Sequence, residues 1–343
     1  MSLRKLTGDL EAVYRRPVPP SAAELLPLID ETNRVLESED PKRRPRDGGG
    51  MPGGMVRLDP ALPTLLLPDL HARAGFLLTV LLGSELRALE RISRGDLQLV
   101  CVGDAFHGEA RVAARWFGAL REHMGGYRDH ALMDAEMRES LGVMEMAMRV
   151  KCAFPAAFHF LKGNHENVAN EQGRGNHPFI KFAAEGEMVA VYVMQFFGED
   201  FMRGVYRYEH NLPLLAVGRG FLVSHGEPRR PFTRRELVEY RQLEEVVEGL
   251  TWTDNGAAEP GSVRNMLELH LGELDADGRR SLYFGGHRPV PGLYATRQAG
   301  RYVQFHNPGR QVVALIQDEG VIDLDRDIRE IRLDFPIPGS FSG

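Results

Sequence analysis

Five short apolar runs, each ending abruptly at polar residues, constrain the fold of this chain more than any other feature. Each run has the length of a β-strand, and helical patterns lie between several of them, notably at Phe76–Ser93 and Glu109–Leu120. Buried strands of α/β folds have this pattern. The runs are Leu62–Leu67, Leu97–Val102, Phe158–Leu161, Gly220–Val223 and Leu282–Phe284. Polar residues at the carboxyl ends of such strands usually bind ligands, so we expect them to gather at one edge.

The first two runs lead to side chains of the types that commonly bind metal ions. Asp69 and His71 follow the first run, and in extended backbone residues two apart face the same side, so both can bind one ion. Asp104 follows the second run directly after Gly103, which lets the chain turn sharply. A carboxylate in that position could bridge two cations with its two oxygens.

The other three runs lead to Asn164, His225 and His287. Asn164 offers a neutral carbonyl oxygen, while its neighbour His165 points elsewhere and stays free to handle a proton. Mixed nitrogen and oxygen donors suit Mn, Fe, Zn or Co better than Ca or Mg. Two such divalent ions about 3.5–4 Å apart generate a nucleophile and stabilise an in-line displacement. The sequence therefore predicts a cationic dinuclear site suited to a phosphate ester.

In this order the motifs resemble those of the calcineurin-like metallophosphoesterase superfamily. That family has Asp-x-His, Gly-Asp, Gly-Asn-His-Glu, a His and a final Gly-His, and the resemblance runs from about Leu62 to Ala314. Ser224-His-Gly226, preceded by a Leu-Pro-led strand, and Leu250-Thr-Trp-Thr-Asp254 are similar to the Ser/Thr protein phosphatase branch. The resemblance implies an α/β (α+β) fold in which two mixed β-sheets pack as a sandwich between helical layers, with the metals at one rim.

The resemblance also implies roles for individual residues. The first metal would be held by Asp69, His71 and Asp104, and the second by Asp104, Asn164, His225 and His287. A hydroxide bridging the metals would attack the phosphorus, and His165 would be the general acid that protonates the leaving alkoxide. The cofactors expected are two divalent transition-metal ions, Mn and/or Fe, with Zn or Co as alternatives.

One motif departs from the phosphatase branch, which has Gly-Asp-x-x-Asp-Arg-Gly where this chain has Gly103-Asp-Ala-Phe-His-Gly108. His107 replaces the Asp that orients the catalytic histidine, and Gly108 replaces an Arg that clamps phosphate. His107 could hydrogen-bond near the site or touch the substrate. Candidates for binding the substrate phosphate are Arg264, which follows the Trp-containing loop, and Arg288 beside His287. His306 falls where the family has a loop beside the active site.

The chain divides into three predicted parts. Residues 1–58 would form an N-terminal helix at Ser21–Leu36 and a flexible basic arm rich in Gly and Pro at Pro41–Gly54. Residues 59–330 would form the metallophosphoesterase domain, and residues 331–343 a C-terminal tail. A Met-rich stretch near residues 121–150 predicts an amphipathic helical insertion in which Met fills gaps in the packing. A cap or a homodimer surface is the alternative for this stretch.

Composition limits the partners and the compartment. The formal net charge is -6, from 42 Lys+Arg against 48 Asp+Glu, so broad nucleic-acid binding is disfavoured. A nuclease of the same superfamily also conflicts with Pro289, which stands where a second final histidine would be. Cys101 and Cys152 lie in apolar runs and are expected to be buried thiols in a reducing compartment. No apolar stretch is long enough to span a membrane, and we expect a cytoplasmic protein.

Three functions remain open at this stage. The first is hydrolysis of phosphomonoesters, with a phosphoprotein or a small phosphorylated metabolite as the substrate. The second is a nucleotide hydrolase, such as one that cleaves dinucleoside polyphosphates. The third is an inactive metal-bound scaffold that binds phosphorylated partners, which the missing arginine suggests. The intact Gly-Asn-His-Glu favours an enzyme, because a scaffold needs no spare histidine beside the metals.

Overall fold

Two mixed β-sheets form the centre of the protein in the computed structural model, which describes residues 2–272, 280–317 and 321–337. The six-stranded sheet has the order β1 (Met55–Arg57), β5 (Leu215–Gly218), β6 (Phe221–Ser224), β7 (Leu282–Gly285), β9 (Tyr302–Gln304) and β8 (Ala295–Arg297). The five-stranded sheet has the order β11 (Ile328–Glu330), β10 (Val312–Ile316), β2 (Thr64–Leu67), β3 (Gln98–Cys101) and β4 (Phe158–Phe160). All five predicted strands are present, and the predicted fold class is confirmed.

The alternation of side chains along the strands builds the layers. Leu66 of β2 and Val100 of β3 face the six-stranded sheet, where they pack in one buried cluster with Val223 and Phe284. Leu65, like the other outward-facing residues of β2 and β3, packs against helices instead. Because successive side chains of a strand point to opposite faces, both faces of these central strands are apolar after their first residues, Thr64 and Gln98.

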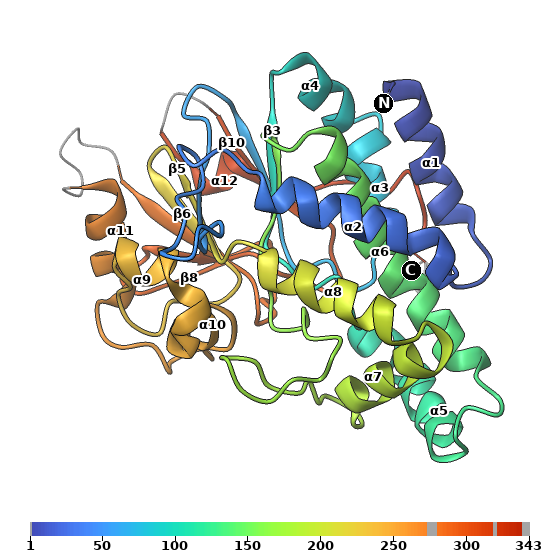
Figure 1. Cartoon of the computed structure of the whole chain (residues 1–343). Helices are drawn as coiled ribbons and strands as arrows, with labels where there is room; N and C mark the ends of the chain where they lie inside the picture. Colours follow the sequence, from blue (N-terminus) through green and yellow to red (C-terminus); the bar gives the residue numbers. More distant parts are fainter. Residues whose placement is uncertain (1, 273–279, 318–320, 338–343) are drawn as a thin grey trace.

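Helices cover the outer face of each sheet (Figure 1). The five-stranded sheet packs against a layer made of α1 (Leu3–Arg15), α2 (Ala22–Glu37), α3 (Ala74–Leu82), α4 (Ala88–Arg94), α5 (Ala113–Met124), α6 (Ala131–Ala153), α7 (Glu185–Phe196) and α8 (Glu199–Asn211). The six-stranded sheet packs against α9 (Arg234–Val238), α10 (Glu244–Thr251) and α11 (Ser262–Leu271). The remaining short elements are η1 (Glu109–Val112), η2 (Tyr240–Gln242) and α12 (Leu324–Asp327).

Residues 1–58 belong to this core rather than to a separate arm. The predicted helix is α2, and Ser21 caps it in a capping box with Glu24. The sequence analysis did not anticipate α1, which packs on α3 and α6. In the predicted basic arm, the buried Arg44 donates hydrogen bonds to the carbonyl oxygens of Gly53 and Asn211, each at 2.7 Å. The segment is therefore anchored to the body of the protein.

The Met-rich stretch is also part of the core. It forms most of α6, a helix of 23 residues that contacts α1, α2, α3 and α5. Met133, Met137, Met144, Met146 and Met148 are buried there, which agrees with a role for Met in packing. The predicted helical stretch Phe76–Ser93 is divided into α3 and α4, because the backbone leaves α3 in an extended conformation at Gly83.

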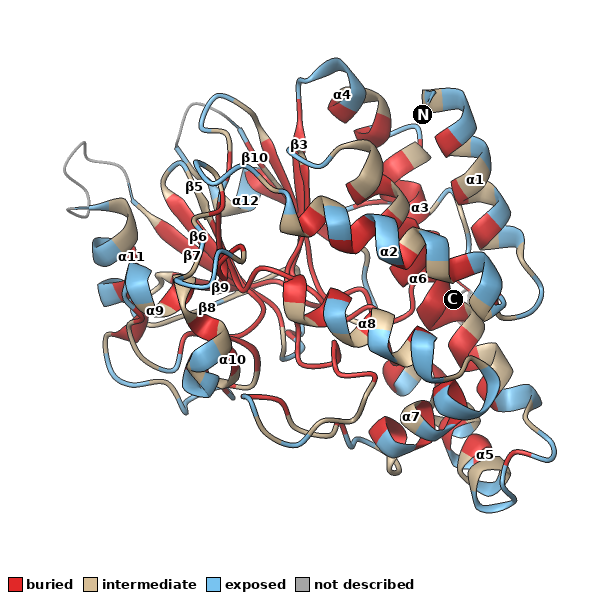
Figure 2. Cartoon of the chain, viewed as in Figure 1, coloured by how far each residue is buried: buried red, intermediate tan, exposed pale blue. Residues whose placement is uncertain are grey.

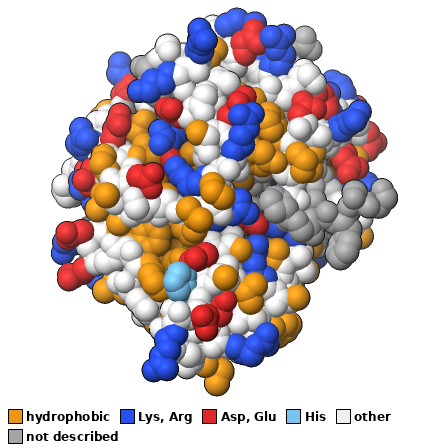
Figure 3. Space-filling view, turned by 90° about the vertical axis from the view of Figure 1, so that its right-hand side faces the viewer, with side chains coloured by type: hydrophobic (Ala, Val, Ile, Leu, Met, Phe, Trp, Pro, Cys, Tyr) orange, Lys and Arg blue, Asp and Glu red, His pale blue; other side chains and the backbone are white. Residues whose placement is uncertain are grey.

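Several outer helices, such as α2 and α8, have buried residues on one side and exposed residues on the other (Figure 2). Charged side chains of both signs surround hydrophobic ones on the face opposite the six-stranded sheet (Figure 3). Exposed hydrophobic residues on α5 and α7 include Phe117, Val191, Met194 and Phe196. Of the helices in the described part of the chain, none has the length and apolar character needed to cross a bilayer.

The packing of the C-terminal residues and the burial of one cysteine differ from the predictions. The predicted tail packs on the core as far as Ile337, and the hydroxyl of Tyr14 donates to the carbonyl of Pro336 at 2.8 Å; residues 338–343 lie outside the described ones. Both cysteines are free thiols. Cys101 is buried in β3 as expected, whereas Cys152 is only partly buried near the end of α6.

Candidate metal centre

The loops that follow β2 and β3 run side by side. The N–H groups of Leu70 and His71 donate to the carbonyls of Gly103 and Asp104, at 3.2 and 2.6 Å. His71, Asp104 and His287 all have positive φ, at 43°, 58° and 61°. Such backbone conformations cost energy for residues other than Gly and cluster at functional sites. They turn the side chains that follow three separate strands towards a common centre.

The loop after β4 is tied to the loop after β3 by the buried carboxylate of Glu166. It accepts hydrogen bonds from the N–H groups of Gly163 at 2.6 Å, Asp104 at 2.9 Å and Ala105 at 2.7 Å. The N–H of His165 donates to Oδ1 of Asp104 at 3.0 Å. These bonds hold the Gly-Asn-His-Glu loop against Asp104, so Glu166 acts as a clamp between two sets of candidate ligands.

The first group of donors comprises Asp69, His71 and Asp104. Nδ1 of His71 lies 3.2 Å from the carbonyl of Phe106, a contact that favours the proton on Nδ1 and leaves Nε2 as a free ligand atom. That Nε2 lies 3.4 Å from Oδ2 of Asp104 and 4.0 Å from Oδ2 of Asp69. Nε2 of His71 thus lies near both carboxylates, and donor atoms of His71, Asp104 and His165 also lie within 4.8 Å of one another.

The second group comprises Asn164, His225 and His287, again with Asp104. Oδ1 of Asn164 lies 2.9 Å from Nε2 of His225 and 3.2 Å from Nδ1 of His287. Nε2 of His225 is also 3.6 Å from Oδ2 of Asp104, while its Nδ1 faces the carbonyl of Val102 at 3.1 Å. Asp104 thus lies close to histidines of both groups.

Burial keeps the histidines of both groups neutral, the state in which imidazole binds metals. Burial lowers the pKa of His71 to about 3, and it also lowers the pKa of His225 and His287. Burial, reinforced by the nearby charge of Asp69, raises the pKa of Asp104 well above its usual value. Oδ1 of Asp69 is buried without a hydrogen-bond partner. Divalent cations would complement this carboxylate and the neutral imidazoles around it, so the residues fit two metal ions.

The proposed proton donor lies beside the same centre. The ring of His165 packs on Phe179, with ring centroids 4.7 Å apart, and lies 5.1 Å from the ring of His107. Its Nδ1 has no hydrogen-bond partner. Burial, together with His107 and His71, lowers the pKa of His165 well below its usual value. The ring is therefore fixed in place while one nitrogen stays free.

His107 lies behind His165 rather than at the substrate. Its Nδ1 accepts a hydrogen bond from the N–H of Glu109 at 3.2 Å, so the proton of the neutral ring is on Nε2, which lies 3.5 Å from Oε1 of Glu185. The ring is stacked between Trp116 and Phe182, with centroids 4.9 and 5.9 Å away. Glu185 was not among the predicted residues, because no local motif links α7 to the loop after β3.

A pocket opens beside the two groups of donors. It is lined by His71, Asp104, Glu109, Asn164, His165, Phe179, Ile180, Lys181, Trp252, His287 and Arg288. Two cationic side chains, Lys181 and Arg288, therefore line the pocket. Lys181 was not among the predicted residues, and its Nζ lies 2.8 Å from Oε1 of Glu109. Arg288 is paired with Asp254, with Nε and Oδ1 2.5 Å apart.

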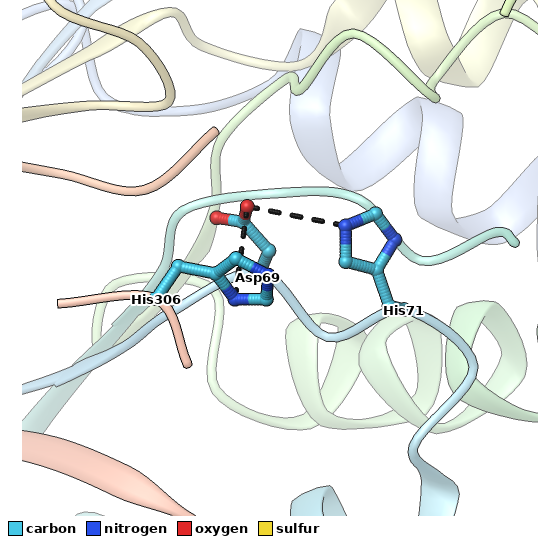
Figure 4. Close-up of side chains that lie close together, drawn as sticks. All are labelled: Asp69, His71 and His306. Carbon is cyan, nitrogen blue, oxygen red and sulfur yellow. Dashed lines mark ion pairs between the residues drawn. The ribbon is translucent and has the colours of Figure 1, made fainter. Parts of the chain in front are cut away.

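Arg264, the other predicted phosphate ligand, does not line this pocket. It lies on α11 with a side chain that is 70% exposed, and its Nε donates to Oε1 of Glu268 one turn further along the helix. His306 shows the opposite outcome. Its ring is fully buried beside Asp69 and His71 (Figure 4), and the sequence analysis had given it no more than a place near the site.

Comparisons with known proteins agree with this geometry. The profile of the calcineurin-like phosphoesterase family matches residues 62–324, which is most of the chain, so the protein belongs to that family and is a metal-dependent phosphoesterase. No curated protein matches the sequence.

Among solved structures, the fold is similar to a protein serine/threonine phosphatase from Saccharomyces cerevisiae. That match has 13% identity and a TM-score of 0.55, and it covers 94% of each chain. A cold-active protein-tyrosine phosphatase of a Shewanella species has 13% identity and a TM-score of 0.46, over 82% of this chain and 83% of that one. The first match agrees with the predicted likeness to the Ser/Thr phosphatase branch at the level of the fold.

Proposed function

We propose that this phosphoesterase hydrolyses phosphomonoesters at a dinuclear metal centre. The first ion is bound by Asp69, His71 and Asp104, and the second by Asp104, Asn164, His225 and His287. The observation that carries the proposal is the position of Asp104. Its Oδ2 lies between Nε2 of His71 at 3.4 Å and Nε2 of His225 at 3.6 Å, where one carboxylate joins two groups of donors.

Two bound divalent ions supply an activated water and stabilise the charge that develops on the phosphoryl group. The protein holds their ligands in register through contacts beyond the ligands themselves. Glu166 fixes Asp104 and the Asn164 loop, while backbone carbonyls orient His71 and His225. Such contacts set the tautomer and direction of a ligating imidazole. The choice among Mn, Fe, Zn and Co is left open by this donor set.

His165 is the proposed general acid for the leaving alkoxide. It lines the pocket and has a ring nitrogen without a partner, so it can pass a proton to an oxygen bound there. A doubly charged phosphate ester in the pocket would favour the protonated form of His165. His107 lies behind the ring of His165, and Oε1 of Glu185 lies 3.5 Å from Nε2 of His107.

Lys181 and Arg288 are the proposed phosphate ligands. Both line the pocket, and both are partly exposed, at 41% and 47% of the side chain. They would compensate for Gly108, where the phosphatase branch has an arginine. An ammonium and a guanidinium suit the same substrate oxygens, and hydrogen bonds between charged groups are about twice as strong as neutral ones.

The test is hydrolysis of p-nitrophenyl phosphate by the purified protein, with and without added Mn. We expect turnover that depends on metal and is lost in Asp104→Asn and His165→Ala. His130→Ala is the matched control, because His130 is a half-buried histidine paired with Asp134 on α6. Activity that survives in Asp104→Asn would contradict the proposal. Bound metal without turnover would favour the phosphate-binding scaffold.

A further inference from the structure

His306 is a buried histidine without hydrogen bonds. Its side chain has no exposed surface, and neither ring nitrogen has a hydrogen-bond partner. Burying an unsatisfied polar group costs free energy, so such groups normally have a partner or a role. The surroundings of the two ring nitrogens therefore indicate the role of His306.

The backbone places the ring in the same layer as His287. His306 follows the end of β9, which is parallel to β7, and Gly285 of β7 lies opposite Gln304. The N–H of Phe305 donates to the carbonyl of Gly285 at 3.3 Å, and the carbonyl of His306 accepts from the N–H of Val290 at 2.9 Å. The ring is therefore fixed by the sheet itself rather than by a mobile loop.

The two nitrogens of His306 face carboxylates on opposite sides. Nδ1 lies 3.8 Å from Oδ2 of Asp69, the same oxygen that lies 4.0 Å from Nε2 of His71 (Figure 4). One donor atom from each of these three residues lies within 4.8 Å of the others. Nε2 of His306 lies 3.4 Å from Oε2 of Glu109. Oε1 of Glu109 also lies 3.5 Å from Nε2 of His71, so this carboxylate stands at the edge of the donor cluster, where it can fix the ring of His306 through Nε2, as carboxylates commonly do for metal-binding histidines.

We propose that His306 is a further ligand of the first metal ion, through Nδ1, and that Glu109 positions its ring through Nε2. This inference rests on the proposed dinuclear centre. It gives the first ion four protein ligands, namely Asp69, His71, Asp104 and His306. Two imidazoles among the four favour a transition metal over Mg, which prefers oxygen donors.

A second buried histidine shows that free ring nitrogens alone do not make a site. His159 is also buried, and neither of its ring nitrogens has a hydrogen-bond partner. However, its charged neighbours include the cations Lys151 and Arg44 as well as Glu39, and a metal ion would be repelled there. The surroundings of His306 are different, because Asp69 and Glu109 bring two carboxylates to it.

The experiment measures bound Mn by elemental analysis and by competition with a chelator, on folded protein verified by circular dichroism. Wild type is expected to bind two ions per chain. His306→Ala is expected to retain the second ion and to bind the first about tenfold more weakly or worse. The coupling between two Mn ions seen by electron paramagnetic resonance would be replaced by the spectrum of an isolated ion. Glu109→Gln should bind both ions, with an affinity for the first that is about 10–100-fold lower.

His159→Gln is the matched control for a buried histidine and should leave both affinities unchanged. If His306→Ala does not fold, the same measurements on His306→Gln decide the matter. Two tightly bound, coupled ions in the His306 variant would overturn the inference while leaving the dinuclear centre intact. No bound metal in wild type would instead remove the proposed function and this inference together.

Discussion

Replacing Gly286 with Ala should damage the metal centre far more than the fold. A Cβ on Gly286 would lie 1.8 Å from Oδ1 and 2.8 Å from Cγ of Asp69. Ordinary contact begins at about 3.4 Å, so the carboxylate must retreat by roughly 1.6 Å. Asp69 then loses the hydrogen bond that its Oδ2 accepts from the N–H of His287 at 2.9 Å. A hydrogen bond to a charged group contributes about 1.5–3 kcal/mol to stability.

The displaced carboxylate can no longer meet the other ligands of the first ion. Misplacement by about 1 Å in an active site costs roughly 10²-fold in rate, and we expect at least that loss in hydrolysis of p-nitrophenyl phosphate by Gly286→Ala. Urea unfolding of metal-free protein measures the change in stability. Gly8→Ala is the control: a Cβ there meets nothing within 4 Å on α1, so it should raise stability by about 0.5–1 kcal/mol and leave activity unchanged. Wild-type activity and metal content in Gly286→Ala would refute the reasoning.

Three further predictions concern the surroundings of the site and the stability of the fold. Glu185→Gln should keep both metals but lower kcat by up to about 10²-fold and alter the pH profile of kcat, because His107 loses the carboxylate that faces it. An unchanged pH profile would count against a role for Glu185 in catalysis. Lys181→Ala should raise the KM for p-nitrophenyl phosphate about tenfold, which corresponds to the loss of one charge-assisted hydrogen bond. Arg264→Ala is the control and should not change the KM. Equal effects of the two substitutions would argue against Lys181 as a phosphate ligand. Burial raises the pKa of Glu39, but two buried cations outweigh it and bring the pKa to about 2. Because this pKa lies below the unfolded value, the stability that Glu39 contributes is present at neutral pH and is lost as the pH falls from about 4 to 2. The destabilisation by Glu39→Gln, about 3–5 kcal/mol at pH 7, should therefore shrink in acid. A difference in unfolding free energy between wild type and Glu39→Gln that is constant with pH would be inconsistent with this.

The residues that could be predicted are those that directly follow the ends of buried strands. Asp69, Asp104, Asn164 and His225 each follow a buried strand within a few positions, so a local pattern is enough to place them at one edge. His306 follows the strand β9 in the same way. The apolar residues before His306 therefore indicate a strand that ends at the site, but the family motifs include no histidine at this position.

The residues that could not be predicted depend on how distant elements pack. Glu185 and Lys181 reach the site because α7 and the segment before it lie over the loop after β3, and no spacing in the sequence fixes that arrangement. Arg264 was chosen by its place after a loop, but α11 turns it towards solvent, where it pairs with Glu268. The buried Arg44 lay in a stretch whose composition suggested a flexible arm, because composition does not show which carbonyl groups a guanidinium will meet.

The measurement that tests the central claim most directly is a crystal structure of the protein with Mn, with anomalous scattering recorded at the Mn edge. We expect two peaks per chain, one on either side of the Asp104 carboxylate. One lies among Asp69, His71 and His306, and the other among Asn164, His225 and His287. No peak at these residues, or a single peak that Asp104 does not contact, would contradict the proposal of a dinuclear phosphoesterase.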